Sequence, residues 1–182
     1  MMHDEELHPR MAEVVGALRD AQQEMLALLD GVSPERAVRR PHDHAWSIAQ
    51  VVEHLAIVED GTGRLIGTLL KQVKDTRDSD TTPIAPTLAP WRVMDAAARP
   101  IAAPPMVTPG DTASLAEAAA RQGASRARLI AALIDASGRA LGAVSHPHPV
   151  LGALDGYQWA LFLAQHQRRH FAQLRTILAS QP

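Results

Sequence analysis

The segment "HQRRHFAQL" (residues 166–174) places two histidines four residues apart near the end of the chain. On a helix this spacing puts His166 and His170 one above the other. Apolar residues recur around them with helical spacing, at Trp159, Leu163, Leu174 and Ile177. The two histidines fill the gap in that series, so we expect a helix that carries two imidazoles in the stripe it buries.

A third histidine occupies a similar position in the segment "WSIAQVVEHLAIVE" (residues 46–59). Ser47 and Gln50 have the spacing of a capping box, which predicts that a helix begins there. Apolar and small residues then recur at spacings of three and four, at Val51, Leu55, Val58, Thr62, Leu65 and Leu69. His54 lies between Val51 and Val58 on the helical wheel, so it leans into the same buried seam.

Comparable patterns predict four helices, at about residues 9–30, 47–74, 113–141 and 155–179. Seven prolines between residues 75 and 112 exclude a continuous helix in that connection. The segment "GAVSHPHPVLGALDG" (residues 142–156) predicts a Gly/Pro loop, and Asp155 is a suitable N-cap for the last helix. We therefore expect one all-α domain over residues 1–182. We expect a four-helix bundle, and its long Pro-rich connection between the second and third helices allows an up-down-down-up order.

The composition limits the classes of function. The net charge is −2, so no basic field exists to attract nucleic acid or anionic lipid. Cysteine is absent, which excludes disulfides, thiolate metal sites and a cysteine nucleophile. No apolar run approaches the length of a membrane-spanning helix, and the acidic start "MMHDEELHPRMAEV" (residues 1–14) does not resemble a signal peptide. We expect a cytoplasmic protein with no nucleic-acid or membrane partner.

Three imidazoles in buried seams need partners, because burying a neutral polar group without one costs ~1–3 kcal/mol. Two histidines one helical turn apart can chelate one ion, as in the HExxH motif, and a third from a facing helix completes a three-nitrogen site. We therefore interpret His54, His166 and His170 as the ligands of one divalent ion, Zn²⁺, Ni²⁺, Mn²⁺ or Fe²⁺. The alternative is that each ring hydrogen-bonds to a carboxylate or carbonyl across the bundle.

The other six histidines are weaker ligand candidates, because they lie in expected loops or near a terminus that can fray. They are His3, His8, His42, His44, His146 and His148. We expect solvated positions for them, and His148, which precedes the last helix, is the best candidate for supporting the ligands from outside. Trp46 and Trp159 lie about two helical turns from a ligand. We expect them to form apolar walls of the site, with ordinary core packing as the alternative.

The segments "WSIAQVVEHLAIVE" and "HPVLGALDGYQWALFLAQHQRRHFAQL" (residues 148–174), in this order, resemble the DinB/YfiT-like family of metal-binding four-helix bundles. The resemblance covers helices two and four and the loop before helix four, whereas helices one and three agree only in position and length. It implies an up-down-down-up bundle that binds one divalent ion through His54, His166 and His170, and it implies frequent homodimers. Some relatives transfer low-molecular-weight thiols to electrophiles or isomerise maleylpyruvate with a thiol cofactor, and many have no known activity.

Three functions remain open on the sequence. The first is a metal-dependent thiol S-transferase acting on small electrophiles, in which the metal holds a cofactor thiol as its thiolate. The lack of cysteine fits a nucleophile that a low-molecular-weight thiol supplies. The second is a non-catalytic bundle that a metal or a histidine network stabilises. The third is a metal-dependent hydrolase that uses metal-bound water. The sequence identifies no catalytic residue beyond the ligands.

Overall fold

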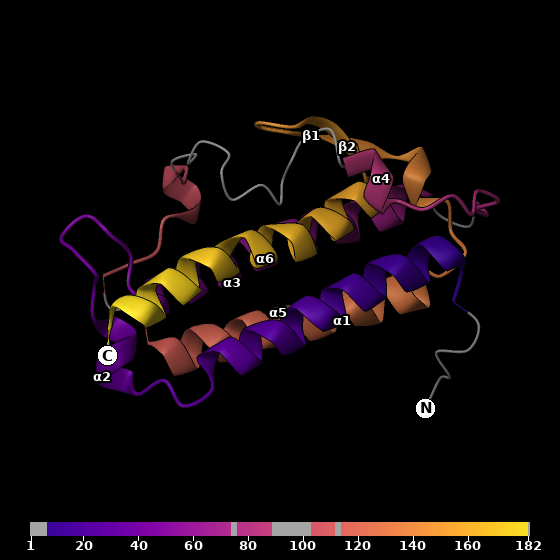
Figure 1. The fold of residues 1–182 in the computed structure, drawn as a ribbon. Helices are drawn as coiled ribbons and strands as arrows, with labels where there is room; N and C mark the ends of the chain where they lie inside the picture. Colours follow the sequence, from indigo (N-terminus) through magenta and orange to yellow (C-terminus); the bar gives the residue numbers. More distant parts are fainter. Residues whose placement is uncertain (1–6, 74–75, 89–102, 112–113, 182) are drawn as a thin grey trace.

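The computed structural model describes residues 7–73, 76–88, 103–111 and 114–181. Four long helices form a bundle, namely α1 (Pro9–Leu29), α3 (Ile48–Val73), α5 (Leu115–Asp135) and α6 (Gly156–Ser180). Helices α1 and α6 run in one direction and α3 and α5 in the other, so the order is up-down-down-up (Figure 1). Helix α3 packs against α5 and α6. The two helices that carry the predicted ligands are therefore neighbours.

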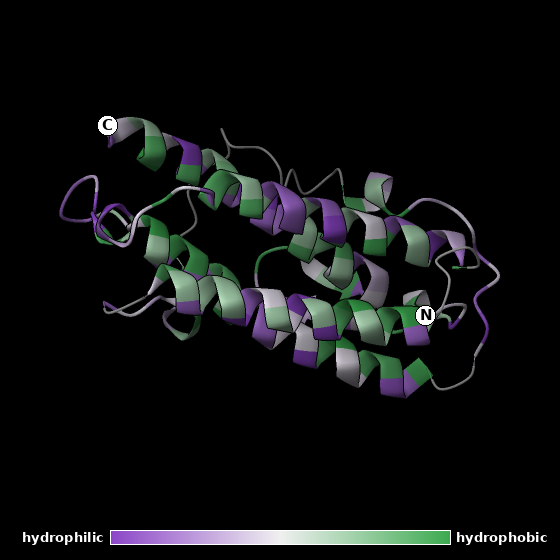
Figure 2. Cartoon of the chain, turned by 90° about the horizontal axis from the view of Figure 1, so that it is seen from below, coloured by the Kyte–Doolittle hydropathy of each residue, from purple (hydrophilic) through white to green (hydrophobic). Residues whose placement is uncertain are grey.

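The core follows the apolar seams that the sequence predicts. On α1, five residues spaced by three and four are buried, namely Met11, Val14, Leu18, Ala21 and Met25. On α3, the seam residues Val51, Leu55, Thr62 and Leu69 are buried, whereas Val58 and Leu65 are partly buried. The long helices carry hydrophobic and hydrophilic residues along their whole length, as expected for a bundle with one face inside (Figure 2).

The third long helix is shorter than predicted. Helix α5 ends at Asp135 and not at residue 141, because the chain turns away at Gly138, whose φ of 80° is in the left-handed region. Beyond this turn Ala140 N donates to Thr76 O, and Asp78 N donates to Gly138 O. The 3-10 turn η4 (Leu141–Ala143) then packs against α6 and α3.

The expected Gly/Pro loop before the last helix is instead a small antiparallel hairpin of β1 (Ser145–His148) and β2 (Gly152–Asp155), with His146 paired to Leu154. The turn closes through His148, whose Nδ1 accepts hydrogen bonds from Val150 N and Leu151 N at 3.1 Å each. Gly152 has a φ of 80°, which the turn requires. The four-helix bundle therefore carries one two-stranded addition at the end where α6 begins (Figure 1).

Helix α6 has a well-defined start. Asp155 Oδ1 accepts from Gln158 N, and Gln158 Oε1 accepts from Asp155 N, both at 2.9 Å, which completes a capping box. Gly156 is the first helical residue, and a Cβ added there would lie 2.5 Å from Leu141 Cδ1 and 3.0 Å from its carbonyl oxygen. A glycine is required for η4 to pack this closely against α6.

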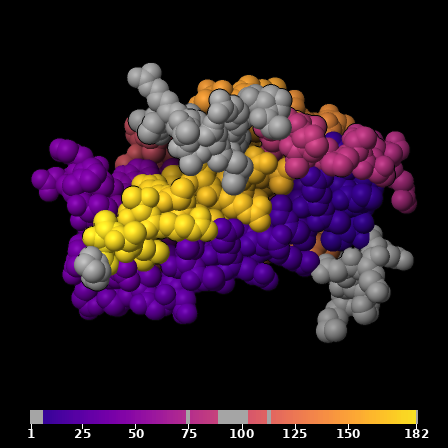
Figure 3. Space-filling view, viewed as in Figure 1, coloured from indigo at the N-terminus to yellow at the C-terminus, as the bar shows by residue number. Residues whose placement is uncertain are grey.

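The described parts of the long connection are tied to the bundle. The short helix α4 (Ala85–Leu88) begins where Glu13 accepts hydrogen bonds from Ile84 N and Ala85 N, and Ile84 is fully buried. Residues 76–88 therefore cover the end at which α1 and α6 begin (Figure 3). The 3-10 turn η3 (Pro105–Val107) lies near α3. The short helix α2 (Pro34–Val38) joins α1 to α3. No helix among the described residues is long and apolar enough to cross a membrane.

Candidate metal centre

The predicted ligands meet between α3 and α6. Helix α3 begins with the predicted capping box, in which Gln50 Oε1 accepts from Ser47 N at 3.1 Å and Ser47 Oγ accepts from Gln50 N at 3.3 Å. His54 is one turn further on and is 4% exposed. Its ring centroid lies 5.3 Å from that of His166 and 4.9 Å from that of His170, and the two α6 rings are 4.7 Å apart.

One nitrogen from each ring lies within 4.8 Å of the other two. No second group of three or more His, Asp or Glu side chains with this spacing occurs in the described part of the chain. The three histidines that were singled out for their positions in apolar seams are therefore also grouped in space.

Hydrogen bonds fix the proton of two of the rings on Nδ1. His54 Nδ1 lies 2.7 Å from the Val107 carbonyl oxygen, which can only accept, so His54 carries its hydrogen on Nδ1. His170 Nδ1 lies 2.9 Å from Gln173 Oε1, which also accepts. In the neutral rings the lone pairs of His54 and His170 are therefore on Nε2.

The Nε2 atoms of His54 and His170, which carry no hydrogen, are suited to bind a cation. His170 Nε2 lies 3.3 Å from His166 Nε2, so a lone pair faces the third ring at close range. A hydrogen on His166 Nε2 could satisfy one such lone pair but not two. Two nitrogens bound to one tetrahedral ion at ~2.0–2.1 Å lie ~3.4 Å apart. The donor set and this separation both fit a divalent ion with imidazole ligands.

Burial keeps the three rings neutral. It is the largest cause that lowers the pKa of His54, and the bond to Val107 opposes it. Burial also lowers the pKa of His166 far below its ordinary value, and His170 and His54 add to the effect. The pKa of His170 falls to about 4, mainly through burial and against the hydrogen bond to Gln173. Neutral imidazole is the form that coordinates metal, so the rings are ready ligands near neutral pH.

Three side chains from the first two turns of α3 hold residues 107–110 beside the site. In addition to the His54 contact, Glu53 Oε2 accepts from Gly110 N at 2.8 Å, and Gln50 Nε2 donates to Gly110 O at 3.1 Å. The contacts that hold this part of the connection therefore come from the ligand helix itself. Part of the long connection is thus a direct neighbour of the histidines.

The two tryptophans differ in their relation to the site. Trp46 lies against His54, with 5.1 Å between ring centroids, as the expectation of an apolar wall requires. Phe162 lies between Trp159 and the three grouped histidines, since its ring centroid is 5.9 Å from that of Trp159 and 5.5 Å from that of His166. Trp159 packs below the hairpin, where its Nε1 donates to His146 O at 3.0 Å.

The remaining histidines do not join the group. His148 contacts the Phe162 ring at 4.7 Å and uses Nδ1 to close the hairpin turn, so its observed contacts are structural. His42, His44 and His146 are exposed, and His8 is half-buried just before α1. His3 lies outside the described residues.

A buried polar network was missed in the sequence. Arg126 forms two bonds to the Glu59 carboxylate, at 2.6 and 2.8 Å, and both side chains are at most 3% exposed. Arg126 also donates to Leu18 O and to Gln167 Oε1. The network joins all four long helices, and its member Gln167 directly follows His166 on α6. The sequence did indicate that Arg126 is buried, because it continues the helical spacing of the buried residues Gln122, Leu129 and Leu133.

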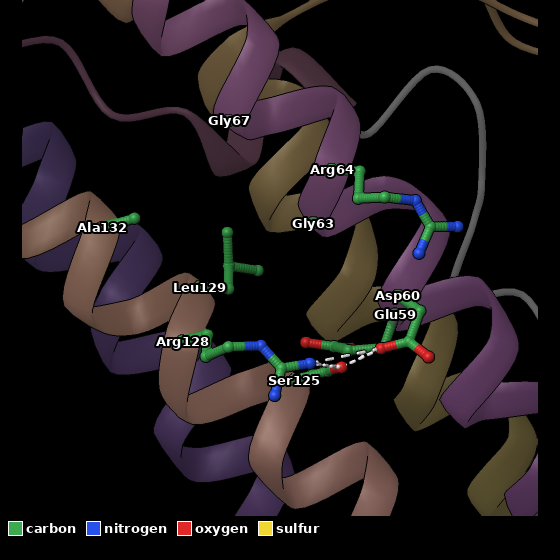
Figure 4. Close-up of a pocket in the computed structure, with 9 residues that line it drawn as sticks. All are labelled: Glu59, Asp60, Gly63, Arg64, Gly67, Ser125, Arg128, Leu129 and Ala132. Atoms are coloured by element: carbon green, nitrogen blue, oxygen red, sulfur yellow. Dashed lines mark hydrogen bonds and ion pairs between the residues drawn. The ribbon is translucent and has the colours of Figure 1, made fainter.

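A separate groove of about 190 Å³ lies on the outer side of the α3–α5 contact. Figure 4 shows Asp60, Ser125 and Arg128 turned toward one another, whereas Arg64 points away from them. Asp60 accepts from Ser125 and Arg121 and is paired with Arg128, so its charge is already used within the protein. None of the three grouped histidines lines this groove.

Comparison with known proteins identifies the family. A solved structure described as TT2238, a four-helix bundle protein, superposes with a TM-score of 0.61 and covers 91% of this chain and 98% of its own, at 22% identity. At this identity the likeness concerns the fold alone. No curated protein matches the chain. The family model of the DinB superfamily matches residues 17–174, which include all three histidines, and the chain therefore belongs to the DinB superfamily.

Proposed function

We propose that the protein binds one divalent metal ion through His54, His166 and His170. The observation that carries the proposal is that His54 and His170 each donate from Nδ1 to an acceptor oxygen. The Nε2 atom of each ring therefore carries no hydrogen, and its lone pair is available to a metal ion. Membership of the DinB superfamily adds support, because this superfamily is associated with metals. Zn²⁺, Ni²⁺, Mn²⁺ and Fe²⁺ all accept imidazole, and the protein has no thiolate that would restrict the choice.

A titration of metal-free protein with Zn²⁺ tests this proposal. Isothermal calorimetry should give one tight site per chain, and replacing any of the three histidines by alanine should abolish it or weaken it strongly. His146→Ala is the matched control, since His146 is exposed and its ring is not in the group. Unchanged stoichiometry and affinity in a ligand variant would show that the ion binds elsewhere.

We further propose that the chemistry is thiol S-transfer to a small electrophile. An ion held by three neutral ligands keeps its full charge and favours the anionic form of a bound thiol. In the transfer, the thiol sulfur forms a bond to carbon, the leaving group departs with the bonding electrons, and the thiol proton goes to solvent.

Two features of the chain favour this chemistry over a protein-based nucleophile or base. The sequence has no cysteine to act as nucleophile. The carboxylates next to the site are already engaged, Glu53 with Gly110 N and Glu59 with Arg126. The Trp46 and Phe162 rings beside His54 and His166 supply apolar surface for an organic electrophile.

A turnover screen separates this proposal from its alternatives. Metal-loaded protein, a chelated control and His166→Ala would be mixed with an activated aryl halide and several low-molecular-weight thiols. Conjugate formation by the loaded wild-type protein alone is expected. Ester hydrolysis without thiol dependence would favour the hydrolase, and metal binding without turnover of either substrate class would favour the non-catalytic bundle.

The homodimer that the family resemblance implies is also a proposal. Sedimentation equilibrium of the full chain, with and without metal, should give twice the monomer mass of 19.6 kDa. A single species at the monomer mass in both samples would exclude it.

A further inference from the structure

The side chain of Gln173 forms a hydrogen bond with His170, one of the three proposed metal ligands. It lies three residues after His170, so its side chain reaches the same face of α6 one turn further on. Its Oε1 is 2.9 Å from His170 Nδ1, while the other nitrogen of this ring, Nε2, is 3.3 Å from His166 Nε2. One side of the His170 ring is thus tied to an amide and the other faces the grouped nitrogens.

The hydrogen bond decides which nitrogen is available. Neutral imidazole carries one hydrogen, and an amide oxygen can only accept. With Gln173 Oε1 as acceptor, that hydrogen stays on Nδ1 and the lone pair stays on Nε2. Without an acceptor at this position, the hydrogen is free to move to Nε2, which removes the lone pair that faces His166.

His54 is also in the Nδ1–H tautomer, but a backbone carbonyl and not a side chain accepts its hydrogen bond. Its Nδ1 donates to the backbone carbonyl of Val107, which belongs to the long connection. A backbone carbonyl cannot be removed by substitution of its own side chain. Gln173 is therefore the contact of this kind that mutagenesis can test directly.

We propose that Gln173 is a positioning residue that holds His170 in the Nδ1–H tautomer and so presents Nε2 to the ion. The part that concerns the ion rests on the proposed function, whereas the tautomer does not. Outer hydrogen-bond partners of metal-bound histidines typically contribute ~10–100-fold to metal affinity. Gln173→Leu should lower Zn²⁺ affinity by about this factor, and Gln173→Glu, which keeps an acceptor oxygen, should retain affinity.

The first measurement uses metal-free protein. Nitrogen-15 spectra of the imidazoles near neutral pH should show His170 as the Nδ1–H form in the wild-type protein and in Gln173→Glu. In Gln173→Leu its signals should move toward the Nε2–H form. Gln165→Leu is the matched control, since Gln165 is a half-buried glutamine of the same helix. Gln173→Ala, which favours the helix, serves as a second loss-of-acceptor variant.

The second measurement is calorimetric titration of the same proteins with Zn²⁺. An unchanged His170 tautomer in both Gln173→Leu and Gln173→Ala would overturn the proposal. An altered tautomer with wild-type Zn²⁺ affinity would overturn its metal-positioning part. An altered tautomer in a protein whose wild-type form binds no Zn²⁺ would instead contradict the proposed function and leave the role of Gln173 in fixing the ring intact.

Discussion

Replacing Arg126 by methionine should strongly destabilise the protein. The Arg126 and Glu59 side chains are 2% and 3% exposed, so the change leaves a buried carboxylate without its counter-ion. Breaking a buried pair in this way costs ~3–5 kcal/mol. The Leu18 carbonyl and the Gln167 carboxamide also lose a donor, at ~1 kcal/mol each. Methionine fills much of the volume, so we expect a total loss of about 5–7 kcal/mol in the free energy of unfolding.

A double variant tests whether the charge is the cause. Arg126→Met with Glu59→Leu removes the carboxylate as well and leaves only the two neutral acceptors without a donor. Its expected loss is ~2 kcal/mol, so the second change should recover about 3–5 kcal/mol. If Arg126→Met alone does not fold, the double variant should fold.

The assay is urea unfolding of chelated protein, followed by far-ultraviolet circular dichroism. Arg121→Met is the matched control, because Arg121 also pairs with α3, through Asp60 at 2.7 Å, but is 50% exposed. That pair should contribute ~0–1 kcal/mol. Equal losses for Arg126→Met and Arg121→Met, or a double variant less stable than Arg126→Met, would refute the reasoning.

Three further predictions concern protonation, the long connection and the start of α6. Because burial lowers the pKa values of the three grouped histidines, that of His170 to about 4, the unfolded chain binds more protons than the folded one below pH ~6.5. Urea unfolding of chelated protein should therefore show stability that falls as the pH drops from about 6.5 toward 4, and a flat profile would contradict the burial of neutral rings. Glu13→Ala should speed hydrogen exchange at Ile84, whose amide loses its acceptor, and an unchanged rate would mean that this contact does not hold the connection. Gly156→Ala should cost ~1–3 kcal/mol through overpacking, whereas Gly16→Ala, with open space around it, should be neutral or stabilising, and the same sign for both would be inconsistent with the packing described.

The bundle could be predicted because its signals are local and periodic. The seam of α1, the capping pairs at Ser47 and Asp155, and the prolines of the long connection each act over a few residues. The same periodicity selected the three histidines, since a polar residue in an apolar stripe is visible without knowledge of the fold. Their grouping in space then follows from α3 and α6 being neighbours.

The parts that were missed depend on contacts between distant residues. The hairpin strands have four residues each and no apolar alternation, and Pro147 and Pro149 favour a loop, so the pairing of the two strands with each other was needed to recognise them. The partner of His54 lies 53 residues away, in the 3-10 turn η3 of the long connection. Arg126 stands in a seam as clearly as the histidines do, but its partner Glu59 could be identified only from the helix packing.

The central claim is that three imidazoles bind one ion, and an anomalous-scattering map of crystals loaded with Zn²⁺ tests it most directly. We expect one strong peak per chain, ~2.0–2.1 Å from the Nε2 atoms of His54, His166 and His170. Peaks confined to exposed histidines such as His42 or His146, or an ion bound through fewer than three of these rings, would contradict the account.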